Sequence, residues 1–193
     1  MAGDKARLFG ELVADVATCR RCGLCEGAKN RVNGEGNLDS RVVFVGEAPG
    51  RREDESGRPF VGSAGKLLDR LLAEAGLSRR SVFISNVVRC RPPGNRKPKG
   101  AEVEACSGHL ERLLGIIEPR VIAPMGNSAV EYVFARYGLG EAVIGGVHGK
   151  PLRAEASWDG VTVFPLYHPA AAIYNRGLLD ELEADMAALA GLL

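Results

Sequence analysis

Five cysteines carry the most specific chemistry in this 193-residue chain. Cys19 and Cys22 form a C-x2-C pair, whose spacing lets two thiolates reach one metal, and Cys90 and Cys106 can supply a second pair. Four thiolates suit either Zn²⁺ or an iron–sulfur cluster. Cys22 and Cys25 have the same spacing, however, and Cys106 falls on an apolar helical stripe typical of a core residue. Spacing alone therefore leaves the ligand set and the metal open.

The segment 46–65 combines glycines with acidic residues directly after an apolar run. Glycine lets backbone amides approach a ligand closely, and residues 62–65 open a helical pattern whose free amides can hold a phosphate. The segment matches neither G-x-G-x-x-G nor a Walker loop. Glycine content by itself therefore favours a plain strand-to-helix loop with a capped helix.

The segment 89–100 is basic and contains no acidic residue. Its cations are Arg89, Arg91, Arg96, Lys97 and Lys99. In a chain with a formal net charge of +1 this is a concentrated patch, and such patches make the phosphate contacts that supply most non-specific DNA affinity. A solvated basic loop explains the segment equally well.

Two polar residues lie at the ends of apolar runs. A buried amide at Asn86 must be satisfied, either by bridging two loops or by presenting a donor and an acceptor to the edge of a base. His168 precedes Pro169 in a predicted turn, where a lone histidine is more often structural.

The elements that position these residues follow from hydrophobic patterning. Short apolar runs predict buried strands at 41–46, 82–88, 120–126 and 161–167. Helical periodicity predicts helices over 4–17, 67–75, 101–117, 127–136 and 178–189. This alternation predicts an α/β fold with a mostly parallel sheet covered on both faces. Because ligands bind outside the carboxyl ends of such strands, the polar segments converge on one rim.

Composition excludes several other classes of protein. Apolar residues make up 46% and charged residues 25% of the chain, and no apolar run approaches the ~20 residues that span a bilayer. The first residues lack the unbroken apolar stretch of a signal peptide. We therefore expect a single domain over 1–193, monomeric, without membrane contact, in the cytoplasm, where thiols stay reduced.

Three stretches together resemble the type-4 uracil-DNA glycosylases, the iron–sulfur branch of the uracil-DNA glycosylase superfamily. They are GEAPGRREDESGRPFVGSAGKLLDRLL, SNVVRCRPPGNRKP and YHPAAAIYN. The resemblance implies a three-layer α/β/α sandwich with a central four-stranded parallel sheet. It also implies a [4Fe–4S] cluster held by four of the cysteines, and it does not require the fifth, Cys25. The implied ligands are Cys19, Cys22, Cys90 and Cys106.

The resemblance implies the site residues as well. Uracil contacts fall on Gly46, Glu47, Ala48, Phe60, Asn86 and His168. DNA contacts are expected at Ser63, Arg91, Asn95, Arg96 and Lys97, with Ile173 as a wedge in the DNA and Arg176 on a phosphate. The family lacks the water-activating Asp of better-known uracil glycosylases, so the general base stays open. Its candidates are Glu47, Glu53 and Asp54.

The implied activity is that of a uracil-DNA glycosylase that starts base-excision repair. A uracil nucleotide flips out of DNA, and hydrolysis of its N-glycosidic bond leaves an abasic site. Phe60 would stack on the base, and Asn86 would accept from uracil N3–H and donate to O4, a pattern that cytosine reverses. His168 would stabilise the departing uracil anion at O2.

Other interpretations stay open. A zinc or iron–sulfur nucleic-acid-binding module without glycosylase activity would use the same cysteines and basic loop, but would not need Phe60, Asn86 and His168 together. A glycosylase of broader deaminated-base specificity would share the whole site. A Rossmann-type nucleotide enzyme requires G-x-G-x-x-G, which the sequence does not contain.

Overall fold

A six-stranded sheet forms the centre of the computed structural model, which describes residues 2–193. Its strands are β1 (Glu35–Gly36), β2 (Val42–Gly46), β3 (Phe83–Asn86), β4 (Val121–Pro124), β5 (Leu152–Glu155) and β6 (Gly160–Val163). They lie in the order β1-β3-β2-β4-β6-β5. The inner four run parallel, whereas β1 and β5 pair antiparallel at the two edges.

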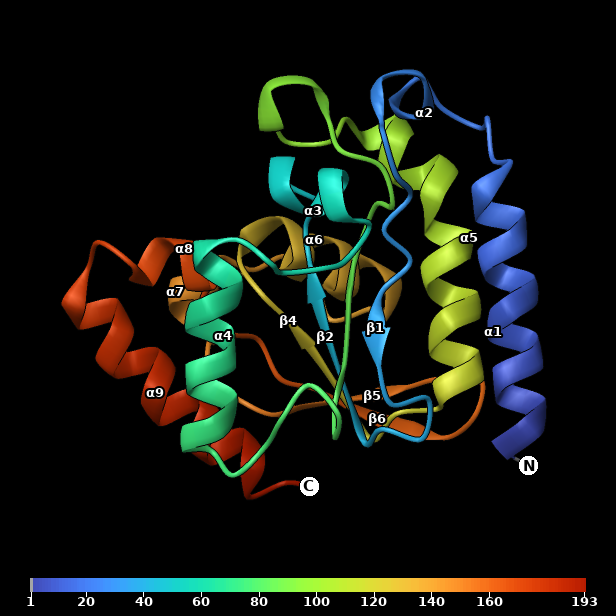
Figure 1. The fold of residues 1–193 in the computed structure, drawn as a ribbon. Coiled ribbons are helices and arrows are strands. Elements are labelled where there is room, and N and C mark those ends of the chain that lie inside the picture. The colour runs from blue at the N-terminus through green and yellow to red at the C-terminus, as the bar shows by residue number, and fades with distance from the viewer. Residues whose placement is uncertain (1) are drawn as a thin grey trace.

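Side chains of β2 alternate between the two faces of the sheet, and each face has its own helices. Val43 and Val45 join a core beneath α1, α5 and α6, whereas Val42 and Phe44 join a second core beneath α4 and α9. In Figure 1, α1 and α5 stand on one side of the sheet and α4 and α9 on the other. The longer helices are α1 (Ala2–Ala17), α4 (Ser63–Glu74), α5 (Gly100–Ile117), α6 (Asn127–Arg136) and α9 (Arg176–Ala190).

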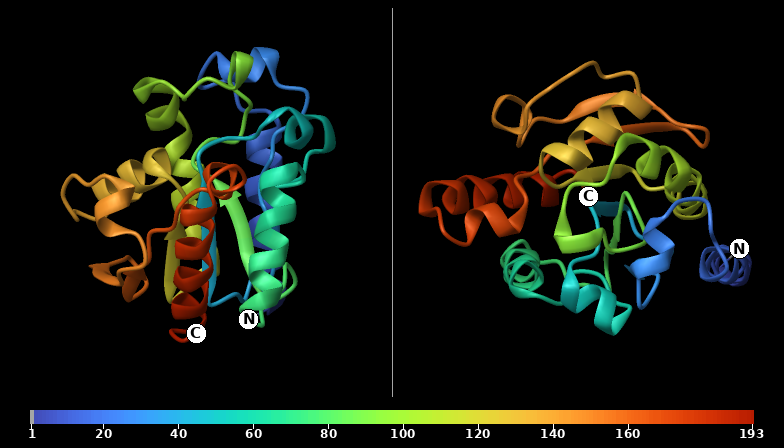
Figure 2. Two further views of the ribbon diagram at one scale, coloured as in Figure 1. Left: turned by 90° about the vertical axis from the view of Figure 1, so that its left-hand side faces the viewer. Right: turned by 90° about the horizontal axis from the view of Figure 1, so that it is seen from above.

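Short helical segments occupy the connections. They are α2 (Leu24–Gly27), α3 (Arg51–Ser56), the 3₁₀ turn η1 (Pro93–Asn95), α7 (Ile144–Val147) and α8 (Pro169–Ala172). Because α3, η1 and α8 follow β2, β3 and β6, all three begin beyond the carboxyl end of an inner strand. Figures 1 and 2 show α2 and the loop around η1 side by side at this end of the molecule.

The predicted three-layer sandwich with four parallel strands is confirmed, with two additions at its edges. β1 has only two residues and β5 reads LRAE, so neither carries the apolar run that identified the inner strands. The predicted strands are also longer than the strands that the structure contains. Beyond Val163, for example, the chain bends into the rim, and Leu166 makes only an isolated bridge to Met125.

None of the helices within residues 2–193 combines the length and the apolar character that a bilayer crossing requires.

Candidate active site

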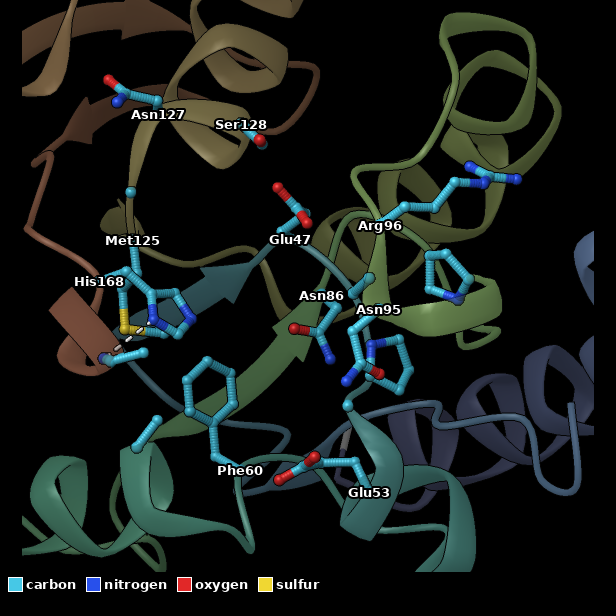
Figure 3. Close-up of a pocket in the computed structure, with 17 residues that line it drawn as sticks. Glu47, Glu53, Phe60, Asn86, Asn95, Arg96, Met125, Asn127, Ser128 and His168 are labelled. Atoms are coloured by element: carbon cyan, nitrogen blue, oxygen red, sulfur yellow. Dashed lines mark hydrogen bonds between the residues drawn. The ribbon is translucent and has the colours of Figure 1, made fainter.

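A cavity of about 560 Å³ opens at the carboxyl ends of the parallel strands (Figure 3). Glu47 follows β2, Asn86 ends β3 and His168 precedes α8. Phe60, from the loop between α3 and α4, faces Asn86 and His168 across the cavity. The cavity wall therefore contains five of the six predicted uracil-contacting residues, including Ala48, while the sixth, Gly46, packs against the Asn86 and Phe60 side chains.

The cavity wall also contains residues that the sequence analysis did not single out. They lie where β4 passes into α6: Met125, Gly126, Asn127 and Ser128. Their only signal in the sequence is their position at the end of the predicted strand 120–126 or directly after it. The Oδ1 atom of Asn127 is not available to a ligand, because it accepts from the amide of Ile144 at 2.9 Å.

Phe60 is fixed in a backbone conformation that its residue type seldom adopts, with φ at 52° in the left-handed region. Arg79 donates to the carbonyl oxygens of Pro59, at 3.0 Å, and of Phe60 itself. Glu53 Oε1 accepts from the two amides that follow Phe60, each at 2.9 Å. Gly65 packs so closely that an added Cβ would lie 1.7 Å from the Phe60 oxygen. These contacts hold the ring in place before any ligand binds.

Asn86 presents an unused carboxamide to the cavity. The residue is 2% exposed, and its side chain has no hydrogen-bond partner among residues 2–193. Gly46 makes this arrangement possible, since an added Cβ there would lie 2.5 Å from Asn86 Oδ1 and 2.7 Å from the Phe60 ring. A buried carboxamide of this kind is suited to a ligand that offers both a donor and an acceptor.

His168 is directed into the cavity, with its ring centroid 5.6 Å from that of Phe60. Its Nδ1 accepts from the amide of Ala170 at 3.1 Å, which places the proton of the neutral ring on Nε2. Burial lowers the pKa of His168 below its usual 6.5, and the nearby Glu53 opposes this only in part. The imidazole is therefore neutral at pH 7 and has an Nε2–H donor.

The three acidic candidates for a general base have different environments. Glu47 lines the cavity, and its carboxylate has no hydrogen-bond partner in the part of the chain that the structure describes. Glu53 also lines the cavity but is engaged by the loop after Phe60. Asp54 is buried outside the cavity, where its Oδ1 accepts from the amides of Lys29 at 2.9 Å and Asn30 at 3.2 Å. This corrects the prediction for Asp54, because its carboxylate holds a turn and does not reach the site.

All five cysteines line one small cavity between the α2 turn, the end of the β3 segment and α5. They are Cys19, Cys22, Cys25, Cys90 and Cys106, and each is a free thiol. Burial raises the pKa of Cys90 to about 12 and also raises that of Cys106. Burial acts in the same direction on Cys19, but hydrogen bonds involving Arg21 outweigh it and lower the pKa of that thiol.

Arginines surround this cysteine cavity. Arg31 donates to the Cys25 carbonyl at 3.2 Å, and Arg89, 1% exposed, lines the cavity itself. Arg89 forms no salt bridge with any described residue, and its buried Nε has no hydrogen-bond partner. Burial lowers its pKa to about 10, which still leaves it charged at pH 7. Arg89 therefore belongs to the interior and not, as the basic run predicted, to a surface patch.

Comparison with known proteins assigns this arrangement to a family. The sequence model of the uracil DNA glycosylase superfamily matches residues 33–189 of this chain. The curated type-4 uracil-DNA glycosylase of Archaeoglobus fulgidus is 45% identical over 175 residues, which cover 91% of this chain and 88% of that protein. That of Sulfurisphaera tokodaii is 46% identical over 172 residues, covering 89% and 78%. The chain belongs to the type-4 uracil-DNA glycosylases.

The cysteine cavity of this type-4 uracil-DNA glycosylase fits an iron–sulfur cluster in its chemistry. Thiolates are the ligands of such clusters, and the unpaired Arg89 offers positive charge to an anionic centre. Within residues 2–193, no three His, Cys, Asp or Glu side chains are grouped to hold a single metal ion. The cavity that the five cysteines share is small, about 20 Å³, and enclosed by apolar side chains such as Val16 and Val88.

Two of the predicted DNA contacts of the glycosylase are already paired with carboxylates. Arg96 donates to both oxygens of Glu102, at 2.8 and 2.6 Å, and this pairing lowers the Glu102 pKa to about 2. Lys97 donates to Glu131 at 2.6 Å. Figure 3 shows the Arg96 side chain extending away from the cavity. A DNA phosphate must therefore compete with these carboxylates.

The other predicted contacts on this side lie at the cavity edge or on the surface. Asn95 lines the cavity and accepts from Arg91 Nε at 2.7 Å. Ser63 is exposed at the start of α4. The amide of Gly62, just before it, is already taken by Glu53, whereas no side chain caps the first turn of α4.

The segment between α8 and α9 presents an aromatic side chain that the sequence analysis passed over. Tyr174 is 94% exposed, whereas the predicted wedge, Ile173, is half-buried. Arg176 is exposed at the start of α9, which Asn175 caps through its side chain. An aromatic residue in the connection between the predicted strand 161–167 and the predicted helix 178–189 is the signal that could have identified Tyr174.

Proposed function

We propose that this chain excises uracil from DNA and leaves an abasic site, the first step of base-excision repair. One observation carries the proposal. The buried carboxamide of Asn86 has no partner among residues 2–193 and opens into the same cavity as the Phe60 ring and a neutral His168. Membership of the type-4 uracil-DNA glycosylases supports the same conclusion.

Base selection follows from the polarity of the Asn86 carboxamide. Uracil presents a donor at N3 and an acceptor at O4, so Oδ1 accepts from N3–H and Nδ2 donates to O4. Cytosine presents the opposite pattern and would leave two buried polar groups facing like groups, which gives strong discrimination. Phe60 stacks on the flipped base, a contact worth about 1–3 kcal/mol. Because its ring is already fixed, stacking requires little further ordering.

Bond cleavage places negative charge on uracil and positive charge on the sugar. His168 donates from Nε2 to uracil O2 and stabilises the leaving anion. The neutral ring can make this bond because its single N–H proton is on Nε2, while Nδ1 accepts from the amide of Ala170. Glu47 is the acidic candidate whose carboxylate is both in the cavity and unpaired among the described residues, so we assign it the orientation of the attacking water. Glu53 acts as a positioning residue for Phe60.

DNA is held along the rim of the cavity. Arg91, Asn95, Arg96, Lys97 and Ser63 contact the backbone on one side, and Arg176 contacts a phosphate on the other. For the gap left by the flipped base we prefer Tyr174 to Ile173, because its ring is free to enter a base stack.

The proposed cofactor is a [4Fe–4S] cluster held by Cys19, Cys22, Cys90 and Cys106. When bound, the cluster supplies a rigid anionic cross-link between the α2 turn, the loop after β3 and α5. The protein residues then keep the Arg91–Lys97 loop at a fixed place beside the DNA. We further propose a monomer in the cytoplasm, consistent with five unpaired thiols.

The test is an incision assay on an oligonucleotide with one uracil, followed by alkali to cut abasic sites. Thymine, cytosine and hypoxanthine oligonucleotides of the same sequence are run in parallel. Cutting at uracil alone supports the proposal. Cutting at hypoxanthine as well would establish broader specificity, and no cutting by protein carrying its cluster would leave only a nucleic-acid-binding role.

A further inference from the structure

Arg89 is a buried cation that the excision chemistry does not use. Arg89 is one of the largest fully buried side chains of the described chain. A buried charge is expensive unless it is paired and hydrogen-bonded. Here no carboxylate is paired with it, and the groups able to become anionic that act on its charge are Cys106, Tyr132 and Cys90, of which the two thiols line the same small cavity as Arg89.

Arg89 also reaches the base-reading strand. Its Nη1 donates to the backbone carbonyl of Asn86 at 3.0 Å and to Ser85 Oγ, and its Nη2 donates to the His109 carbonyl of α5 at 3.3 Å. One guanidinium therefore joins the end of β3 to the helix that carries Cys106. Its Nε–H is buried without a partner, and the side chain lines the cysteine cavity.

We propose that Arg89 is a positioning residue that balances the charge of the thiolate-bound cluster with one side of its guanidinium and holds the backbone of Asn86 with the other. This inference rests on the proposed cluster and the proposed excision of uracil. Asn86 cannot shift without disturbing Arg89, and Arg89 loses its counter-charge when the cluster is lost. The cluster thereby contributes to base recognition although no part of it touches the base.

Arg31 provides a matched control. It also lies beside the cysteines, donates to the carbonyls of Cys25 and Ala28, and has a buried Nε without a partner among the described residues. It makes no hydrogen bond to β3. Arg31→Met therefore removes a cation near the cluster and leaves the support of Asn86 intact, whereas Arg89→Met removes both.

The experiment measures three quantities on the parent protein and on Arg89→Met, Arg89→Lys and Arg31→Met. The first is the reduction potential of the cluster, from a titration followed by electron paramagnetic resonance. Both Met variants should shift it to more negative values, because a nearby cation favours the electron-rich form. Arg89→Lys keeps the charge and should stay near the parent.

The second quantity is hydrogen exchange at the amides of residues 84–88, with α9 as an internal reference. Exchange should accelerate in Arg89→Met but not in Arg31→Met. The third is kcat/KM on uracil-containing DNA, which should fall about 10- to 100-fold in Arg89→Met and stay within about two-fold in Arg31→Met. An unchanged potential or unchanged exchange in Arg89→Met would overturn the inference.

A second measurement covers the case in which Arg89→Met does not fold. The cluster of the parent protein is removed by oxidation and chelation, and exchange at 84–88 is compared with that of α9. Selective acceleration at 84–88 supports the coupling, and equal exchange before and after removal refutes it. If the parent carries a cluster but does not excise uracil, the proposed function fails while the potential and the exchange data still decide the role of Arg89.

Discussion

The base pocket and the cysteine cavity lie four residues apart along the chain, at Asn86 and Cys90, yet they leave different groups unpaired. In the pocket the unpaired buried group is a neutral amide facing a space of about 560 Å³. At the cysteines it is a charged guanidinium beside a space of about 20 Å³. Water can satisfy the amide in the open pocket, whereas the enclosed charge needs an ion.

The two regions should therefore affect different properties of the protein, base recognition in the pocket and fold stability at the cysteines. Changes to groups that face the pocket should lower activity and leave the fold intact. Changes around the cysteines should affect the fold as well, because they leave a buried charge uncompensated.

The largest effect is expected for Asn86→Ala. The variant loses the amide that distinguishes uracil from cytosine, and kcat/KM on uracil DNA should fall on the order of 10³-fold. Its visible absorption should match that of the parent, which shows that the cysteine cavity is unaffected. A variant that cuts like the parent would end the assignment of the pocket.

His168→Gln should lower kcat on the order of 10²-fold, because the leaving anion loses its donor. The parent should also lose activity in acid, as protonation of the ring removes the Nδ1 acceptor used by Ala170. Since burial lowers the pKa of His168, this loss should occur below pH 6.5. A pH profile of kcat/KM checks the position of the acid limb, which should disappear in the variant.

Phe60→Ala should lower kcat/KM by about 10- to 100-fold, equivalent to the stacking energy of one base. Arg79→Met serves as a companion, because it keeps the ring but releases the carbonyls that fix the left-handed backbone. It should give a smaller loss in the same assay. An Arg79→Met loss larger than that of Phe60→Ala would show that Arg79 has a role beyond holding the ring.

Asp54→Ala should lower the stability of the fold and leave the rate of uracil excision unchanged. The buried carboxylate accepts from two backbone amides, so its loss should lower the free energy of unfolding by about 1–3 kcal/mol. Urea denaturation measures this effect, and kcat at a temperature well below the unfolding transition should match the parent. A kcat that falls as far as in His168→Gln would restore Asp54 as a candidate base.

The smallest effect is expected for Cys25→Ser. Cys25 lines the cysteine cavity, but the family pattern does not require it, so the brown colour and the cluster absorption should persist. Cys90→Ser is the contrasting variant and should lose both. Loss of colour in Cys25→Ser with retention in Cys19→Ser would reassign the local pair to Cys22 and Cys25.

Much of the fold could be predicted because the inner strands are buried on both faces and read as continuous apolar runs. VVFVG at 42–46 is an example, and all of its residues are buried. The edge strands escaped prediction because β5 is half-exposed and its side chains depend on pairing with β6. Asn86 and His168 were predicted because position at a strand end already places a side chain on the rim.

The orientation of individual side chains could not be predicted from spacing. Glu53 and Asp54 are adjacent on α3, so they point about 100° apart around the helix, and the sequence does not say which one faces the cavity. Arg89 looked like the first residue of a basic loop, although it is the last buried residue of the strand segment. Only the packing of α5 against that segment supplies its third partner, the His109 carbonyl.

The internal pairs of Arg96 with Glu102 and of Lys97 with Glu131 bear on how the enzyme searches for damage. Counterion release sets the salt dependence of DNA binding, and a cation already neutralised by its own protein releases fewer ions when it meets a phosphate. Undamaged DNA should then be held weakly and let go quickly. Such an enzyme would survey the genome by many short encounters rather than by long one-dimensional sliding, and would stay only where a base has entered its pocket.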